Sequence, residues 1–111
     1  MDVAFRTRKL ERTFNSAAAL QKAHGARMAK VIMTRLAVLR AAPNLAAVPT
    51  SPPDRAHPLK GDREGQFAVD LVHPQRLVFE PNHEPTPRSE DGGIDAGQVT
   101  AIVIVDVTDY H

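Results

Sequence analysis

The chain has 111 residues, 42% hydrophobic and 24% charged with a net charge of +1, which is ordinary for one soluble globular domain with a single modest core. It contains no cysteine, which excludes a disulfide framework, a thiolate metal site and a cysteine nucleophile. At this length we expect a single domain over residues 1–111. The start, MDVAFRTRKLERTF, lacks the apolar region of a secretory signal, and no apolar run approaches the roughly 18 residues of a membrane helix. We therefore expect the protein in the cytoplasm, without a membrane partner.

The first part of the chain is predicted to form a short strand followed by helices. DVAF at residues 2–5 is typical of an opening strand, and TRKLERTFNSAAALQKAHG predicts helix, either continuous or broken near Asn15–Ser16, where Ser16 would cap a second segment. Gly25 is typical of a helix C-terminus. A clearer helix is expected from about Ala26 to Ala42, ended by Pro43. Its apolar residues recur at helical spacing: Met28, Val31, Ile32, Leu36 and Leu39.

This helical part of the chain is strongly basic. Residues 1–42 carry nine Lys and Arg against two acidic residues, a net charge of +7, whereas the remaining residues carry five against eleven, a net charge of −6. Such an asymmetry suggests that the helical part meets a polyanion. Helices also carry Lys and Arg simply because one face is solvated, and charge alone does not choose between these two explanations.

Loops and three strands are predicted for the rest of the chain. Five prolines between Pro43 and Pro58 predict a surface loop, with one turn at NLAAV. Alternation of Phe67, Val69 and Leu71 predicts a half-buried strand, and RLVFE after the turn VHPQ predicts its antiparallel partner, in a register left open. Residues 81–97 are acidic and aperiodic, typical of a mobile loop, and VTAIVIVDV predicts a central strand, apolar on both faces. This order predicts an α+β fold, with the first strand and the helices on one face of an antiparallel sheet.

Several polar residues are candidates for chemistry. They are His57, Lys60, Arg63, Arg76, Asp109, Tyr110 and His111. Taken singly, each of the first four is more often a solvated loop or edge residue. The last three residues are unusual, because chain ends are generally small, polar and disposable, whereas here an acceptor, a phenol and an imidazole follow the most apolar run.

Together these residues form a pattern that resembles a known family. The stretch HPLKGDREGQF, followed by RLVFEP and the terminal IVIVDVTDYH, resembles the HigB branch of the RelE/ParE toxin superfamily, toxins of bacterial type II toxin–antitoxin systems also called plasmid maintenance killer proteins. The resemblance runs from FRTRKL to His111. LKG is weak alone and becomes specific together with DYH. The resemblance implies a fold like that of small microbial ribonucleases and an endoribonuclease that cuts mRNA in the ribosomal A site.

The resemblance also assigns roles. It matches the active-site positions to His57, Lys60, Asp109, Tyr110 and His111, and phosphate binding to Arg76, with Arg63 in the same basic loop as Lys60. In this chemistry the 2′-hydroxyl of RNA attacks the adjacent phosphorus, so the site must supply a base, an acid and charge stabilisation, and needs no metal or other cofactor. The five histidines are dispersed, without an H-x-H or H-x-x-x-H pair that would suggest a metal site.

The resemblance implies partners as well, namely the ribosome with mRNA and a HigA-like helix-turn-helix antitoxin. Two features depart from the family. The loop 81–97 is longer and more acidic than the hairpin of compact members and could reorient ribosome docking, and Asp70 stands where many relatives carry a basic or neutral residue, which would weaken attraction for RNA. Two other functions stay open: a ParE-like toxin that binds gyrase without chemistry and has no use for Lys60 or DYH, and a catalytically silent interaction domain that binds through the loop 81–97.

Overall fold

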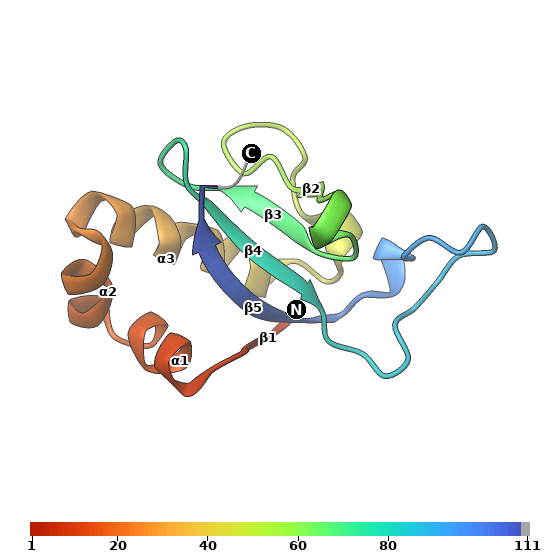
Figure 1. Cartoon of the computed structure of the whole chain (residues 1–111), viewed down its shortest axis with the longest axis horizontal. Helices are drawn as coiled ribbons and strands as arrows, with labels where there is room; N and C mark the ends of the chain where they lie inside the picture. The colour runs from red at the N-terminus through yellow and green to blue at the C-terminus, as the bar shows by residue number, and fades with distance from the viewer. Residues whose placement is uncertain (110–111) are drawn as a thin grey trace.

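Helices cover one face of a five-stranded sheet in the computed structural model, which describes residues 1–109 (Figure 1). The strands are β1 (Asp2–Phe5), β2 (His57–Pro58), β3 (Phe67–Asp70), β4 (Arg76–Pro81) and β5 (Ala101–Thr108), in the order β1-β5-β4-β3-β2. Strands β2 to β5 pair in antiparallel fashion, whereas β1 lies parallel to β5. The α+β fold is therefore confirmed, with a mixed sheet. The parallel pair is feasible because nearly the whole chain connects its two strands.

Three helices follow β1: α1 (Arg8–Phe14), α2 (Ala17–His24) and α3 (Ala26–Ala41). The side chains of Thr7 and Ser16 cap α1 and α2 by accepting hydrogen bonds from backbone N–H groups three residues on, so of the two possibilities left open by the sequence the broken helix is the one observed. Gly25 separates α2 from α3 with a φ of +86°, a conformation that side chains of L-residues rarely adopt. None of the helices described between residues 1 and 109 is long and apolar enough to cross a bilayer.

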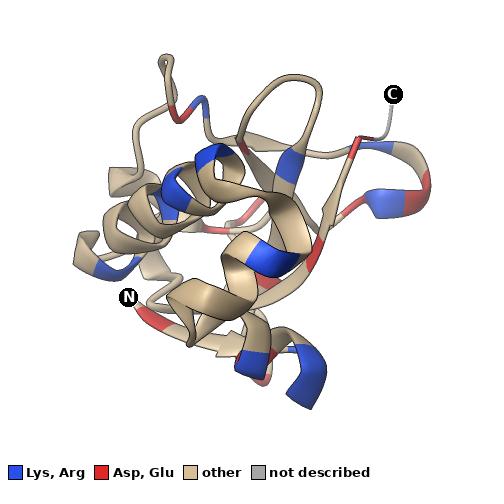
Figure 2. Ribbon diagram, turned by 90° about the vertical axis from the view of Figure 1, so that its left-hand side faces the viewer, with Lys and Arg blue, Asp and Glu red and all other residues tan. Residues whose placement is uncertain are grey.

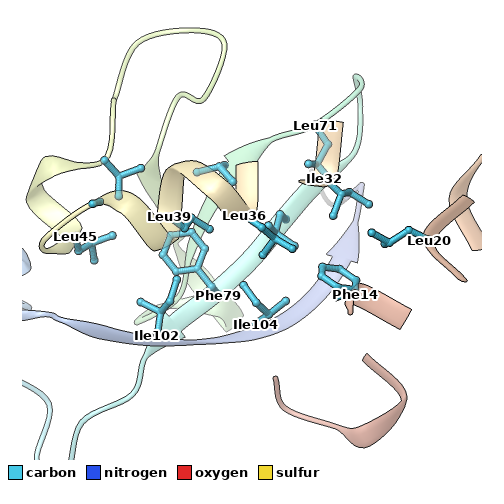
Figure 3. Packing of buried hydrophobic residues seen from close by; sticks show 14 of the residues in the cluster. Phe14, Leu20, Ile32, Leu36, Leu39, Leu45, Leu71, Phe79, Ile102 and Ile104 are labelled. Atoms are coloured by element: carbon cyan, nitrogen blue, oxygen red, sulfur yellow. The ribbon is translucent and has the colours of Figure 1, made fainter. Parts of the chain in front are cut away.

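The main hydrophobic core lies between α3 and the sheet (Figure 3). The predicted stripe of α3 is confirmed, because Ile32, Leu36 and Leu39 are buried and Met28 and Val31 pack at the margin. The buried partners on β4 and β5 are Leu77, Phe79, Ile102 and Ile104. Each such side chain contributes about 1.5–3 kcal/mol when fully buried, so this layer holds the helices to the sheet.

The solvent side of the helices is basic (Figure 2). On α3, the side chains of Arg27, Lys30 and Arg40 are exposed, as the apolar stripe predicts. Arg35 is an exception, because it is only 9% exposed and faces the sheet side of the helix. The positive charge of residues 1–42 is therefore largely a property of the outer helical surface.

The proline-rich loop before β2 packs against the hydrophobic core. Its predicted turn is the 3₁₀ helix η1 (Leu45–Ala47), and both Leu45 and Val48 are buried. The backbone N–H of Leu45 donates to the carbonyl oxygen of Val99 at 3.0 Å. The loop therefore has a defined path from α3 to β2.

The long segment between β4 and β5 projects from one end of the sheet (Figure 1). At its base, Nε2 of His83 accepts hydrogen bonds from the backbone N–H groups of Thr100, at 3.0 Å, and Ala101, at 3.2 Å. Further out, Arg88 and Ile94 form an antiparallel bridge. The base of the segment is thus attached to β5, and the mobility of its tip stays a prediction.

Candidate functional site

Three of the predicted site residues, His57, Arg63 and Arg76, lie on or against the sheet face opposite the helices, here called the open face. Residues paired directly across strands share a face. One row on the open face is His57, Ala68, Val78 and Asp106, and another is Asp70, Arg76 and Thr108. Leu59, Ala68 and Val78 form a small buried cluster between the polar residues, with Val105 packed against it. Strand β5, for which a central position was predicted, is an interior strand paired with β1 and β4, and β4 is the central strand of the sheet.

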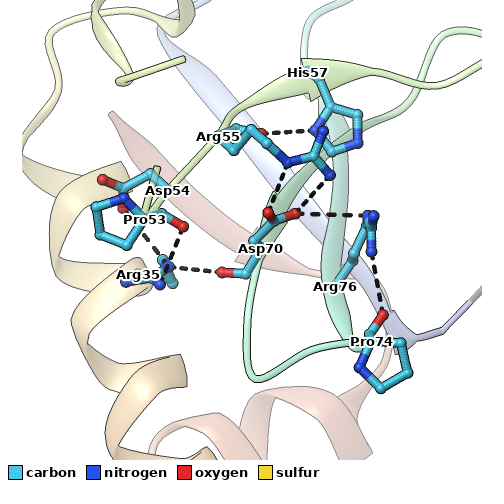
Figure 4. A network of polar contacts seen from close by, with 8 residues as sticks. All are labelled: Arg35, Pro53, Asp54, Arg55, His57, Asp70, Pro74 and Arg76. Carbon is cyan, nitrogen blue, oxygen red and sulfur yellow. Dashed lines mark hydrogen bonds and ion pairs between the residues drawn. The ribbon is translucent and has the colours of Figure 1, made fainter. Parts of the chain in front are cut away.

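Asp70 is the centre of a polar network at one end of the open face (Figure 4). Its Oδ2 accepts a hydrogen bond from Nε of Arg55 at 2.7 Å and its Oδ1 accepts one from Nη2 of Arg55 at 3.0 Å. Nε of Arg76 lies 3.6 Å from Oδ1. Partial burial alone would raise the pKa of Asp70, but the hydrogen bonds and charge of Arg55, with the charges of Arg76 and His57, hold it below its usual value.

The backbone of Asp70 is held by the buried side of the molecule (Figure 4). Its N–H donates to the carbonyl oxygen of Asp54 at 2.8 Å, and its carbonyl oxygen accepts from Nε of Arg35 at 2.7 Å. Nη2 of Arg35 also donates to the carbonyl oxygen of Pro53 at 3.3 Å. One guanidinium from α3 therefore joins the proline-rich loop to the end of β3.

Two predicted residues, His57 and Arg76, belong to this network. Nδ1 of His57 lies 2.7 Å from the carbonyl oxygen of Arg55, and since a carbonyl only accepts, Nδ1 carries the proton. Arg76 begins β4 and donates from Nη1 to the carbonyl oxygen of Pro74 at 3.2 Å. Strands β2 and β4 thus bring an imidazole and a guanidinium to the same end of the open face.

Arg63 belongs to a second polar group further along the open face. It ends the 3₁₀ helix η2 (Gly61–Arg63), where its Nη2 lies 3.8 Å from Oδ2 of Asp106 and its Nη1 donates to Gln66 at 3.1 Å. Gln66 donates to Glu80 at 3.2 Å, and Glu80 pairs with Arg6. Every charge named in this group has an opposite charge beside it.

Lys60 lies apart from both polar groups. It is exposed, beyond the end of β2 and immediately before η2. With Gln66 and Phe67 it lines a hollow of about 630 Å³ whose other wall is the β4–β5 segment, which contributes Arg88 and Ile94. The long segment therefore borders a predicted catalytic residue.

The end of β5 lies beside Arg76. Thr108, its last residue, pairs with Arg76, and the exposed Asp109 follows directly. Tyr110 and His111 lie outside the described residues. The structure therefore places His57 and Arg76 at one end of the open face, with Asp109 directly after the strand end that pairs with Arg76, Arg63 further along this face and Lys60 at a different corner.

Sequence reasoning missed Arg35, Arg55 and Asp106, each of which contacts this face or its support. Asp106 interrupts an apolar run, which was a detectable signal. Arg55 lies in a loop, where no local periodicity reports which strand it will reach. Among residues 1–109, no three His, Asp or Glu side chains gather in a way that could hold a metal ion.

Two solved structures share this fold. A YoeB/ParE toxin from Agrobacterium tumefaciens has 14% sequence identity and a TM-score of 0.58, with 100% of both chains covered. A chain of a YoeB-YefM complex from Staphylococcus aureus has 14% identity and a TM-score of 0.57, covering 100% of this chain and 97% of that one. No protein-family model and no curated protein sequence matches the chain. At this identity the likeness establishes the fold, which is that of the YoeB/ParE toxins.

Proposed function

We propose that this chain, built on the fold of the YoeB/ParE toxins, is the toxin of a toxin–antitoxin pair and an endoribonuclease of the HigB type that cuts mRNA in the ribosomal A site. One observation carries the proposal. His57 and Arg76 lie at the same end of the open face, and Asp109 directly follows Thr108, the strand partner of Arg76. The HPLKGDREGQF and DYH motifs support the HigB assignment within that fold.

The proposed reaction is attack of an RNA 2′-hydroxyl on the adjacent phosphorus, with release of the 5′-oxygen. Arg76 and Lys60 would offset the charge that grows on the phosphate oxygens. His111 would transfer a proton, because an imidazole titrates near cellular pH, and Asp109 would orient or polarise either His111 or the attacking hydroxyl. Tyr110 would stack on a base or donate a hydrogen bond. These roles for Tyr110 and His111 rest on the sequence motif.

The proposed partners rest on one basic surface and on the sequence resemblance. The exposed basic side of α3 and its neighbours suits ribosomal RNA, since phosphate backbones bind Lys and Arg through charge. An antitoxin of the HigA-like helix-turn-helix kind is proposed from the sequence resemblance, and a similar chain in a YoeB-YefM complex is consistent with a protein partner.

A second candidate is a toxin or interaction domain of the same fold without nuclease chemistry, such as a ParE-like gyrase binder. One observation favours it: two predicted phosphate-binding arginines already have acidic neighbours, Arg76 beside Asp70 and Arg63 beside Asp106. A carboxylate next to a guanidinium lowers the positive potential that a phosphate would meet.

Mapping of mRNA cleavage in a purified translation reaction separates these functions. We expect wild-type protein to cut within translated codons and Lys60→Ala and His111→Ala each to lower the rate by about 10²–10⁴. Thr50→Ala, which changes an exposed residue of the proline-rich loop outside both the polar groups of the open face and the basic helical surface, is the control and should cut normally. Inhibition of gyrase supercoiling by wild-type protein without RNA cleavage would favour the ParE-like function, and neither effect would favour an interaction domain.

A further inference from the structure

Two arginines from separate parts of the chain, Arg55 and Arg76, lie against the carboxylate of Asp70. Arg55 binds it through two parallel N–H···O hydrogen bonds, at 2.7 and 3.0 Å, and Arg76 approaches Oδ1 at 3.6 Å. This two-pronged geometry is the one by which guanidinium groups recognise both carboxylates and phosphates. Two phosphate oxygens placed where the Asp70 carboxylate oxygens lie would therefore be within reach of the same guanidinium N–H donors.

The backbone of Arg55 and the side chain of Arg76 are anchored by contacts other than Asp70. Arg55 has a φ of +48°, which is uncommon for a residue with a side chain, and its N–H donates to the carbonyl oxygen of Ser51 at 2.9 Å. Its own carbonyl oxygen accepts from Nδ1 of His57. Arg76 is fixed by strand pairing and by its bond to the carbonyl oxygen of Pro74. Non-glycine residues in such backbone conformations tend to cluster at functional sites.

The site is open to a ligand from solvent. The side chain of Arg55 is 38% exposed and that of Asp70 is 29% exposed, whereas that of Arg76 is 18% exposed. The three side chains carry a net charge of +1, and loss of the Asp70 charge would raise this to +2. A tethered carboxylate competes with any external anion at a high effective concentration, because it is already in place.

From this geometry we propose that Arg55, Arg76 and His57 form a binding site for an RNA phosphodiester, and that Asp70 occupies it from within the chain and so limits its affinity, an inference that rests on the proposed function. Arg55 is then a phosphate-binding residue, and Asp70 is the residue that sets how strongly this end of the open face attracts RNA. The backbone anchors of residue 70, to Asp54 and Arg35, do not involve its carboxylate and remain when the side chain is changed.

The alternative explanation is that Asp70 is only a structural ion pair that holds the loop of Arg55 against β3. Both explanations predict lower stability when Asp70 is replaced. The two explanations differ in what they predict for anion binding. If Asp70 is only structural, its removal should leave the arginines disordered and anion affinity should not rise. If Asp70 competes with phosphate, its removal should leave the arginines available and affinity should rise.

The test is binding of a short fluorescein-labelled single-stranded oligodeoxynucleotide, measured by fluorescence anisotropy. This probe lacks the 2′-hydroxyl, so its binding is independent of RNA cleavage. We expect Asp70→Asn to bind about tenfold more tightly than wild type, the effect of roughly one recovered charge-assisted hydrogen bond. A steeper salt dependence should accompany it, by about 0.7 in log–log slope per additional phosphate contact. Glu90→Gln removes the same charge from the exposed β4–β5 segment and should bind as wild type does.

A second variant keeps the test decisive. Arg55→Gln added to Asp70→Asn should abolish the gain, since it removes the two-pronged donor. If Asp70→Asn does not fold, Asp70→Ser, which keeps the backbone anchors, takes its place in the same measurements. Equal affinity of the folded Asp70 variant and Glu90→Gln would overturn the proposal, and so would a gain that survives the loss of Arg55. A gain in a protein that cuts no RNA would instead refute the nuclease function while leaving the anion site standing.

Discussion

Arg35 of α3 donates from Nε to the backbone carbonyl oxygen of Asp70 at 2.7 Å, and so connects the buried side of a helix to the residue at the centre of the candidate site. The same guanidinium lies 3.7 Å from Oδ1 of Asp54, an oxygen that has no hydrogen-bond partner among the described residues. Both side chains are nearly buried, at 10% and 11% exposed. The ion pair of Arg35 and Asp54, on the helix side of the sheet, therefore helps to position the backbone of Asp70 on the open face.

Replacing Arg35 with methionine should destabilise the protein strongly. The change leaves the carboxylate of Asp54 buried without its counter-charge, and breaking a buried pair from one side costs about 3–5 kcal/mol. Urea unfolding followed by circular dichroism measures the loss. Arg27→Met, on the exposed side of the same helix, should stay within about 0.5 kcal/mol of wild type. Adding Asp54→Asn to Arg35→Met should recover part of the loss, and a single variant as stable as Arg27→Met would contradict this account.

The stability contributed by Asp70 should depend on pH in a defined direction. Its pKa is lowered in the folded protein, so its contribution is fully present above the unfolded pKa of about 3.9 and is lost as pH falls through the lower folded value. The difference in unfolding free energy between wild type and Asp70→Asn should therefore be present at about pH 5 and shrink below about pH 4. Urea titrations at several pH values measure it. A difference that persists undiminished at the lowest pH would mean that the carboxylate charge is not its source.

His83→Ala should weaken the base of the β4–β5 segment. It removes the acceptor for the N–H groups of Thr100 and Ala101 at the start of β5, and loss of a hydrogen-bond partner costs about 1–3 kcal/mol, less where water replaces it. Thermal unfolding and amide hydrogen exchange at Ala101 report the change. His73→Ala, in the exposed turn between β3 and β4, is the control. Unchanged exchange at Ala101 in the His83 variant would show that the imidazole does not hold the strand.

Reversing Arg27, Lys30 and Arg40 to Glu should weaken association with ribosomes without unfolding the protein. All three side chains are exposed on α3, and exposed charges contribute little to stability. Co-sedimentation with ribosomes over a salt series should show both weaker binding and a shallower salt dependence. If the triple variant sediments as wild type does at every salt concentration, the basic helical surface is not the docking surface.

Local features of the sequence were sufficient for most elements of the fold. The stripe from Met28 to Leu39 predicted α3, and its expected end near Pro43 agrees with the observed Ala41. Ser16 and Gly25 predicted the boundaries of α2, because capping is decided by side chains within one turn. The alternation around Val69 and the run of β5 predicted their strands, since burial on one or both faces leaves a local periodic pattern.

The sequence by itself also named His57 and Arg76 among its site candidates, and these two lie at one end of the open face, while their roles stay predictions. Only the tertiary structure decided that β1 lies parallel to β5, that Arg35 is buried rather than part of the basic surface, and that Arg55 donates hydrogen bonds to the carboxylate of Asp70. Each of these depends on residues far apart in the chain meeting at one place. Local pattern records whether a side chain is buried or exposed, but the identity of its partner is settled only when the packed elements bring two charges within contact distance.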